Sequence, residues 1–229
     1  MTSKKFKDTK TWLFDLDNTL YLANLGIFSQ IDEKMKKFIS KKINITEEEA
    51  FKVQKKFYKK YGTTLYGLMK NYDINPDTFL EFVHDIDLKR LKKSDSLKKK
   101  IRALPGKKII YTNADEVYAT RVLKKLGIDD LFFDIFDIKK ASYRPKPMIF
   151  SINKLIKTYK LEPQNVGYFD DLERNLESAH KKGIITIHIS EKSDRGDESF
   201  IDFRFKTITC ALDMIIKRLN VRSFNESKY

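Results

Sequence analysis

The sequence of 229 residues has few of the features that stabilise secreted proteins or hold proteins in membranes. It contains one cysteine, Cys210, which excludes an intrachain disulfide framework and favours a reducing compartment. The basic N-terminus is not followed by the uninterrupted apolar segment of a secretion signal. No apolar stretch approaches the roughly 18–20 residues of a transmembrane helix. These absences predict a soluble, cytoplasmic protein that does not associate with a membrane.

Acidic residues are too few to balance the basic ones, so the formal net charge is +14. Lysine supplies most of the excess, in pairs and triplets such as Lys36–Lys37 and Lys98–Lys100 that lie within helical patterns. No recognisable nucleic-acid motif accompanies these lysines, and the basic stretches are not rich in arginine. We interpret them as solvated helix faces, with a diffuse positive field that attracts an anionic substrate as the alternative. No specific nucleic-acid partner is predicted.

Internal repeats and low-complexity linkers are also absent, and 41% hydrophobic residues suffice for a folded core. Short apolar runs typical of buried strands alternate with helical patterns of 10–15 residues. The predicted strands are residues 11–14, 109–111, 134–136, 166–169, 184–189 and 203–205. Helices are predicted around residues 117–126, 150–159, 172–181 and 212–219, with Gly127 and Gly183 ending two of them. This alternation predicts an α/β fold, a doubly wound and mostly parallel Rossmann-like sheet.

A long helical stretch interrupts the alternation after the first strand and is far too long for a simple crossover. Thr46 and Glu49 form a predicted capping box, and Asn75–Pro76 predicts another helix start. We therefore expect an inserted α-helical cap subdomain, residues 22–100, over the carboxyl edge of the sheet. Residues 1–21 and 101–229 would form the Rossmann-like core.

Polar side chains stand just beyond three predicted strands, at Asp15 and Asp17, Thr112–Asn113, and Asp170–Asp171. A parallel sheet brings such positions together at one edge, where ligands bind in open α/β sheets. Lys146 lies in a proline-flanked loop that opens a helix on the same side. Taken alone, the aspartate pairs and Thr112–Asn113 are explained by helix capping, and one lysine among so many is uninformative. Their convergence under an inserted cap predicts a functional site.

Taken as a set, these segments resemble the four motifs of the haloacid dehalogenase superfamily, in order and at suitable spacing. The resemblance covers about residues 10–190 and rests on Asp15–Leu20, Thr112–Asn113, Lys146 and Phe169–Asp171. Further stretches are similar to the pyrimidine 5′-nucleotidase-like group within it, namely Tyr21, Tyr61–Gly62, Tyr66–Leu68, and Asp170–Asp171 with Asn175.

The resemblance implies a phosphohydrolase that acts through an aspartyl-phosphate intermediate. Asp15 would be the nucleophile, and Asp17 would protonate the leaving alkoxide and then take a proton from the attacking water. Mg²⁺ would be held by the Asp15 carboxylate, the Asp17 backbone carbonyl and Asp170. Because a halide leaving group needs no acid, the presence of Asp17 argues against dehalogenation.

The other motif residues receive binding and supporting roles from the same resemblance. Thr112, Asn113 and Lys146 would bind the phosphate, and Lys146 would also neutralise the Asp15 region. Asp171 would act around the metal or as an accessory ligand, and Asn175 would support the metal site.

The substrate is predicted less directly than the reaction. A nucleoside 5′-monophosphate, preferably a pyrimidine nucleotide, is the first expectation, with another small phosphorylated metabolite such as a sugar phosphate or phosphoglycolate as the alternative. A phosphomutase and a non-catalytic binding module are the remaining, less favoured alternatives for the function. Aromatic residues of the insertion either stack on a base or pack between helices, and both interpretations stay open for Phe57, Tyr58, Tyr61 and Tyr66.

Overall fold

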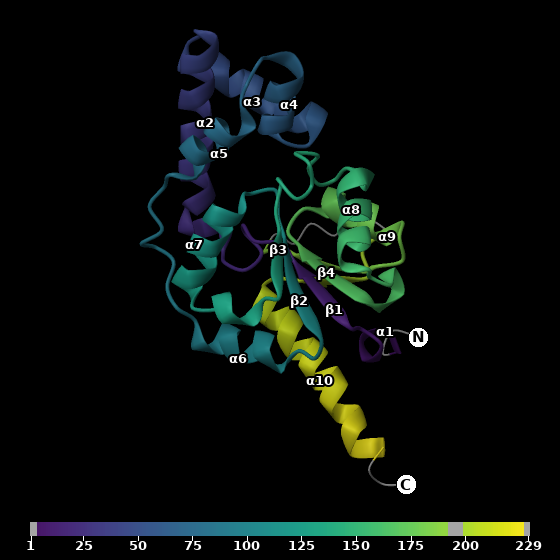
Figure 1. Ribbon diagram of the computed structural model, residues 1–229. Helices are drawn as coiled ribbons and strands as arrows, with labels where there is room; N and C mark the ends of the chain where they lie inside the picture. Colours follow the sequence, from purple (N-terminus) through teal and green to yellow (C-terminus); the bar gives the residue numbers. More distant parts are fainter. Residues whose placement is uncertain (1–3, 192–198, 227–229) are drawn as a thin grey trace.

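A parallel six-stranded sheet in the order β3-β2-β1-β4-β5-β6 forms the centre of the protein (Figure 1). The computed structural model describes residues 4–191 and 199–226. All neighbouring strands pair in parallel, which confirms the predicted doubly wound α/β fold. The strands are β1 (Thr11–Phe14), β2 (Lys107–Tyr111), β3 (Asp134–Phe136), β4 (Val166–Asp170), β5 (Ile185–Ile189) and β6 (Phe203–Phe205).

Helices cover both faces of the sheet, so its central strands are apolar on both sides. In β1, Trp12 and Phe14 face one hydrophobic core and Leu13 faces the other. On the first side lie α7 (Glu116–Leu126) and α10 (Ile208–Glu226), and on the second α8 (Ile149–Tyr159) and α9 (Glu173–His180). The continuous apolar run of β1 follows from this double burial.

The segment between β1 and β2 is helical, as predicted. Its helices are η1 (Ala23–Leu25), α2 (Ile27–Ile43), α3 (Glu47–Tyr61), α4 (Thr64–Asn71), α5 (Pro76–His84) and α6 (Asp95–Ala103). Helices α2 to α5 pack on one another and stand above the sheet in Figure 1. By contrast, α6 packs with α10 and η2 (Asp129–Leu131), on the opposite side of the molecule. Helix α6 therefore packs on the sheet domain at a distance from helices α2 to α5.

The predicted helix boundaries agree with the structure where a specific cap defines them. Thr46 and Glu49 form a reciprocal capping box at the start of α3. The Asn75 side chain accepts hydrogen bonds from two backbone N–H groups at the start of α5, with Pro76 in the first turn. Gly127 ends α7 in the left-handed conformation, with φ of 71°.

Four helical segments were not predicted, and one helix ends before its predicted glycine. The unpredicted segments are α4, η2, α1 (Lys4–Lys7) and η3 (Pro163–Asn165). Helix α4 contains Gly67, where an added Cβ would lie 2.4 Å from the Phe57 Cβ, so this glycine permits close packing on α3. Helix α9 ends at His180 with Lys181 as its cap, and Gly183 lies beyond it.

The described helices also bear on the question of membrane insertion. Across residues 4–191 and 199–226, none combines the length and apolarity needed to cross a bilayer. Cys210 is exposed and is not part of a disulfide.

Candidate active site

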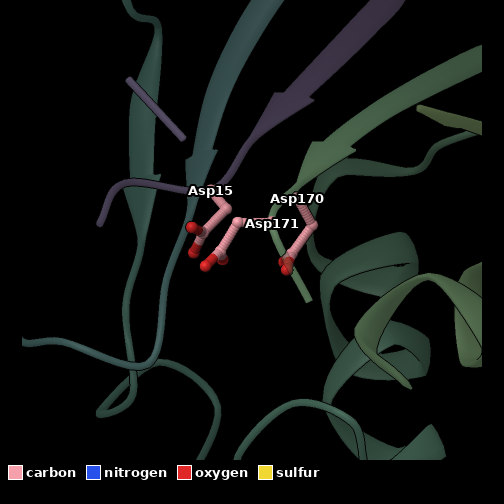
Figure 2. A group of neighbouring side chains, drawn as sticks. All are labelled: Asp15, Asp170 and Asp171. Atoms are coloured by element: carbon pink, nitrogen blue, oxygen red, sulfur yellow. The ribbon is translucent and has the colours of Figure 1, made fainter. Parts of the chain in front are cut away.

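The carboxyl ends of β1, β2 and β4 bring the predicted site residues to one edge of the sheet. Asp15 directly follows β1, Thr112 and Asn113 follow β2, and Asp170 is the last residue of β4. Figure 2 shows Asp15, Asp170 and Asp171 extending from these strand ends into the same space. Residues far apart in the sequence therefore meet because the strands are parallel and in register.

A cavity of about 300 Å³ opens between this edge and helices α2 to α5. The sequence-predicted site residues that line it are Asp15, Asp17, Thr112, Asn113, Lys146, Asp171 and Asn175. Asp170 does not line the cavity and is fully buried behind it. The opposite wall comes from the helical insertion and includes Phe28, Asp32, Gln54, Tyr58 and Phe79.

Lys146 holds Asp15 in place from inside the protein. Its ammonium group, 2% exposed, donates hydrogen bonds to Asp15 Oδ1 at 2.6 Å, Asp170 Oδ2 at 2.9 Å and the Tyr111 carbonyl at 2.9 Å. The Thr19 hydroxyl donates to the other oxygen of Asp15 at 3.1 Å. Burial lowers the pKa of Lys146, but the charges of Asp15 and Asp170 more than offset this, so the pKa lies above its ordinary value. Lys146 is therefore a fixed positive charge beside Asp15.

The loop that carries Lys146 is fastened by Asn113. The Asn113 Oδ1 accepts from the Lys146 backbone N–H at 2.8 Å, and its Nδ2 donates to the Lys146 carbonyl at 3.2 Å. The buried Thr112 hydroxyl accepts from the Ala114 N–H at 3.0 Å and keeps its own hydrogen for another partner. Asn113 thus positions the lysine loop, whereas Thr112 can still donate toward the cavity.

Hydrogen-bond donors surround Asp170. Its Oδ1 accepts from the Leu172 N–H and from Asn175 Nδ2, both at 2.9 Å. Its Oδ2 accepts from Lys146 and from the Tyr168 hydroxyl. Both oxygens of the Asp170 carboxylate therefore have hydrogen-bond donors within the protein, and the carboxylate holds Lys146 and Asn175 in place.

Asp171 lies in a different environment from Asp170. It is half-buried and lines the cavity. Burial, together with the charges of Asp15 and Asp170, raises its pKa, although a hydrogen bond from Asn18 acts in the opposite direction. Carboxylate oxygens of Asp15, Asp170 and Asp171 lie within 4.8 Å of one another, so the group is crowded with negative charge.

This acidic cluster fits a hard divalent cation. Carboxylate oxygens are the ligands that Mg²⁺ prefers. Burial and, to a smaller extent, repulsion from neighbouring aspartates raise the pKa of both Asp15 and Asp171, and a cation would offset both effects. In addition, the buried Oδ1 of Asn175 has no hydrogen-bond partner among the described residues. A metal ion with its bound water is a chemically suitable neighbour for such an oxygen.

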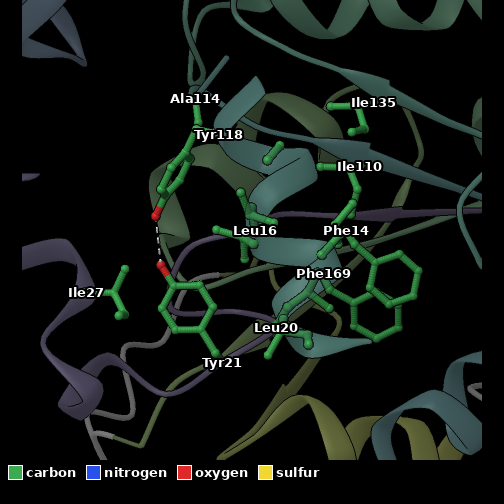
Figure 3. Close-up of a cluster of buried hydrophobic side chains, with 14 of the residues drawn as sticks. Phe14, Leu16, Leu20, Tyr21, Ile27, Ile110, Ala114, Tyr118, Ile135 and Phe169 are labelled. Atoms are coloured by element: carbon green, nitrogen blue, oxygen red, sulfur yellow. Dashed lines mark hydrogen bonds between the residues drawn. The ribbon is translucent and has the colours of Figure 1, made fainter. Parts of the chain in front are cut away.

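Two tyrosine side chains hold the carboxyl group of Asp17 by hydrogen bonds. The hydroxyls of Tyr21 and Tyr118 both donate to its Oδ1, the latter at 2.9 Å, and Figure 3 shows these two hydroxyls facing each other. Burial raises the pKa of Asp17 above its ordinary value, although the tyrosine hydrogen bonds oppose the shift. Sequence reasoning had named Tyr21 only as a feature of a subgroup. It missed Tyr118 because a tyrosine within a helical pattern carries no sign of its partner.

Polar contacts on the helical side of the cavity are fewer. Gln54 Nε2 donates to Asp32 Oδ1 at 2.7 Å, and Lys55 pairs with Asp32 Oδ2 at 2.9 Å. Arg174, from α9, stacks its guanidinium over the Tyr58 ring at 4.1 Å and donates to the Gly62 carbonyl at 3.1 Å. Arg174 thereby links α9 to the helical insertion. Sequence reasoning also missed its role, because nothing in the sequence indicates this long-range contact.

The aromatic residues that were candidates for base stacking separate into two groups. Tyr58 lines the cavity. Phe57 is buried and makes an edge-on contact with Tyr61, and Tyr61 makes another with Tyr66. For these three residues the helix-packing interpretation agrees with the contacts.

Comparison with known proteins identifies the class. The sequence matches the haloacid dehalogenase-like hydrolase family over residues 12–189, and the chain belongs to this family. It is 27% identical over 212 residues to "Phosphate metabolism protein 8" of Saccharomyces cerevisiae, covering 84% of this chain and 65% of the yeast protein. The chain thus spans slightly less than two thirds of that relative. It is 24% identical over 218 residues to "Glyceraldehyde 3-phosphate phosphatase" of Methanocaldococcus jannaschii, covering 89% and 95% of the two chains.

Solved structures agree on the fold. A HAD phosphatase from Thermococcus onnurineus superposes with a TM-score of 0.63 at 18% identity, covering 90% of this chain and 98% of the other. The putative HAD-hydrolase YfnB from Bacillus subtilis, described as bound to magnesium, gives 0.60 at 14% identity with the same coverage. The L-2-haloacid dehalogenase from Xanthobacter autotrophicus gives 0.57 at 12%, again with 90% and 98% covered. The predicted superfamily and fold are confirmed, whereas the pyrimidine 5′-nucleotidase-like subgroup stays a prediction.

Proposed function

We propose that the protein is a Mg²⁺-dependent phosphomonoester hydrolase that acts on a small phosphorylated metabolite through an aspartyl-phosphate at Asp15. The observation that carries the proposal is the setting of Asp15. Lys146 and Thr19 orient its carboxylate at the end of β1, and it lines the same cavity as Asp17. The name of the archaeal relative, a phosphatase, supports the same reaction class.

The proposed reaction has two steps. In the first, an Asp15 oxygen attacks phosphorus as the bond to the leaving oxygen breaks, and Asp17 gives its proton to that oxygen. In the second, Asp17 takes a proton from water, which attacks the aspartyl-phosphate and releases phosphate and free Asp15. Throughout, Lys146 offsets negative charge beside Asp15, and the Thr112 hydroxyl donates to a phosphate oxygen. Asn113 contributes by holding the lysine loop.

For the metal, we propose Asp15 and Asp171 as the carboxylate ligands, because both belong to the acidic cluster and line the cavity, and we retain the Asp17 backbone carbonyl that the family resemblance implies. When bound, Mg²⁺ would offset the charge that otherwise keeps a carboxylate away from an anionic phosphate. The sequence-based prediction had assigned Asp170 as a ligand. Because Asp170 is enclosed by donors and does not line the cavity, we propose that it orients Lys146 and Asn175 instead.

We further propose that helices α2 to α5 act as a cap over Asp15. Such a cap excludes water from the aspartyl-phosphate until the leaving group has departed. The predicted boundary at residue 100 would include α6, but α6 packs with α10. A boundary between α5 and α6 therefore agrees better with the contacts.

The cavity favours a compact metabolite phosphate as substrate, with a nucleoside 5′-monophosphate as the second candidate. Its volume of about 300 Å³ is at the lower end for ligand sites. Of the aromatics proposed to stack on a base, only Tyr58 lines it, and one face of that ring is covered by Arg174. The archaeal relative is named for glyceraldehyde 3-phosphate. A pyrimidine nucleotide stays a candidate because Phe28 and Phe79 also line the cavity and offer aromatic rings to a base.

Phosphate release from a panel of substrates tests the proposal. The panel contains glyceraldehyde 3-phosphate, phosphoglycolate, UMP, CMP and p-nitrophenyl phosphate, each with Mg²⁺ and with EDTA, and Asp15→Asn serves as the blank. We expect Mg²⁺-dependent release that the blank lacks. Preference for UMP or CMP would favour the pyrimidine nucleotidase prediction over a compact metabolite phosphatase. Conversion of glucose 1-phosphate, assayed alongside the panel, to glucose 6-phosphate without release of phosphate would indicate a phosphomutase. No turnover of any substrate would contradict the proposal.

A further inference from the structure

Two tyrosine hydroxyls hold the same oxygen of Asp17. Tyr118 donates to Asp17 Oδ1 at 2.9 Å, and Tyr21 donates to the same atom. The two hydroxyl oxygens are 3.4 Å apart, as the dashed line in Figure 3 marks. Among the residues that the structure describes, no donor reaches Asp17 Oδ2. The two oxygens of this carboxyl group are therefore not equivalent.

Both tyrosines are fixed by their surroundings. Tyr21 and Tyr118 are buried in the hydrophobic core that joins the sheet to the helical insertion (Figure 3). The backbone N–H of Tyr118 donates to Asp115, the N-cap of α7, at 2.8 Å. His84, at the end of α5, stacks on the Tyr118 ring with centroids 4.4 Å apart and pairs with the same Asp115. Neither hydroxyl oxygen can move away from Asp17 without disturbing this packing.

We propose that Tyr21 and Tyr118 are positioning residues that make Asp17 Oδ2 the proton-carrying oxygen of the general acid. The inference rests on the function proposed above. An oxygen that already accepts two hydrogen bonds is a poor place for the acidic proton, because a hydroxyl there would have to compete with both donors. The proton therefore resides on Oδ2. It passes to the leaving oxygen as the P–O bond breaks, and Oδ2 regains a proton from the attacking water.

The proposal can be tested by varying the leaving group. An alkoxide needs a proton to depart, whereas p-nitrophenolate leaves without one, so a misplaced acid harms only the first. The ratio kcat/KM reports steps up to departure of the leaving group, before hydrolysis of the aspartyl-phosphate. For Tyr118→Phe and Tyr21→Phe we expect kcat/KM to fall about tenfold with glycerol phosphate, the effect of one hydrogen bond to a carboxyl group that becomes charged as its proton leaves. With p-nitrophenyl phosphate it should change by less than about twofold.

Tyr159→Phe provides a matched control. The Tyr159 hydroxyl donates to Asp134 Oδ2 at 2.7 Å, away from the cavity, so this variant loses the same kind of bond. It should leave both kcat/KM values unchanged. Activity on p-nitrophenyl phosphate also reports that each variant is folded.

Asp17→Asn separates failure of the inference from failure of the proposed function. A selective loss on glycerol phosphate in this variant would establish Asp17 as the acid. Equal losses on both substrates would reject the acid role that the proposed function gives to Asp17, and the inference with it. If Asp17→Asn is selective, a tenfold loss confined to glycerol phosphate in the tyrosine variants supports the positioning role. Equal loss on both substrates, or no loss on either, would overturn it.

Discussion

The two ends of the cavity are built in different ways. At the sheet end, Lys146 is 2% exposed and Asp170 fully buried, and each is held by several hydrogen bonds. At the helical end, the Asp32 and Lys55 side chains are 32% and 46% exposed and pair mainly with neighbours on α2 and α3. Changing a charge at the sheet end leaves a buried partner unpaired, whereas water compensates at the helical end.

We infer from this difference that the sheet end carries the residues of the proposed reaction, whereas the helical end contacts the leaving group. The sheet end joins β1, β2 and β4 through contacts such as Lys146 to Asp15, 131 residues apart, so its geometry depends on the whole sheet. The helical end depends on local pairs within the insertion. We therefore expect substitutions to have effects that decrease from the sheet end to the helical end.

The largest effect is expected for Asp15→Asn, which removes the proposed nucleophile. The kcat should fall by at least about 10³-fold. Stability should fall less than for Asp170→Asn, although both variants remove a charge beside Lys146, because burial raises the pKa of Asp15 in the folded protein despite Lys146. The charged form of Asp15 is therefore disfavoured, and its contribution to stability decreases as pH rises. Phosphate release and thermal unfolding in EDTA measure both quantities, with the exposed Asp130→Asn as control. Turnover within tenfold of wild type would reject Asp15 as nucleophile.

The second prediction contrasts the two adjacent aspartates at the sheet end. Asp171→Asn should raise the Mg²⁺ concentration for half-maximal activity by at least about tenfold, because it removes a proposed ligand. Asp170→Asn should mainly lower the melting temperature, because Lys146 loses one of its two buried negative partners. Thermal unfolding with increasing Mg²⁺ gives an independent measure of binding. A larger change in metal requirement for Asp170→Asn would favour the sequence-based ligand assignment.

The third prediction concerns the pair of His84 and Asp115, where the insertion meets the sheet domain. Burial raises the pKa of Asp115, but the hydrogen bond and charge of His84 more than offset this, so the pKa lies below its ordinary value. The carboxylate therefore stabilises the fold above the unfolded-state pKa of about 3.9, and this contribution is lost as pH falls through the lower folded-state pKa.

Asp115→Asn should consequently lower the free energy of unfolding by about 1–3 kcal/mol at neutral pH, while asparagine retains the helix cap. The deficit relative to wild type should shrink below about pH 4. Urea unfolding across pH measures it, with Asp95→Asn, an exposed carboxylate in the first turn of α6, as control. A deficit that does not depend on pH would show that the charge of Asp115 is unimportant.

The smallest effect is expected at the helical end. Lys55→Met removes an exposed ion pair with Asp32, so the free energy of unfolding should change by less than about 1 kcal/mol. Because Lys55 lines the cavity, KM should change a few-fold while kcat stays the same. Lys52→Met, which removes a similar exposed pair with Glu48 on the same helix, is the control. A large drop in kcat for Lys55→Met would contradict the proposed division between the two ends.

Sequence patterns over a few residues predicted the strands and helix ends that depend on interactions between neighbouring residues. The apolar runs predicted β3 and β6 at their observed bounds, and the capping box at Thr46 predicted the start of α3. Helix α4 was missed because Gly67 weakens its helical pattern, and its stability depends on close packing against Phe57. A single sequence does not contain that contact.

Periodicity and polar residues after apolar runs are local properties, so the α/β class, the strands and the residues at strand ends could be predicted from the sequence. Three features became visible only in the folded protein: Asp170 is enclosed while Asp171 lines the cavity, Asn113 holds the Lys146 backbone, and Tyr118 reaches Asp17. Each of these depends on the direction of a side chain across the sheet edge. That direction is set by packing between segments that are distant in sequence, such as α5 with α7, and such packing leaves no periodic signal in the chain.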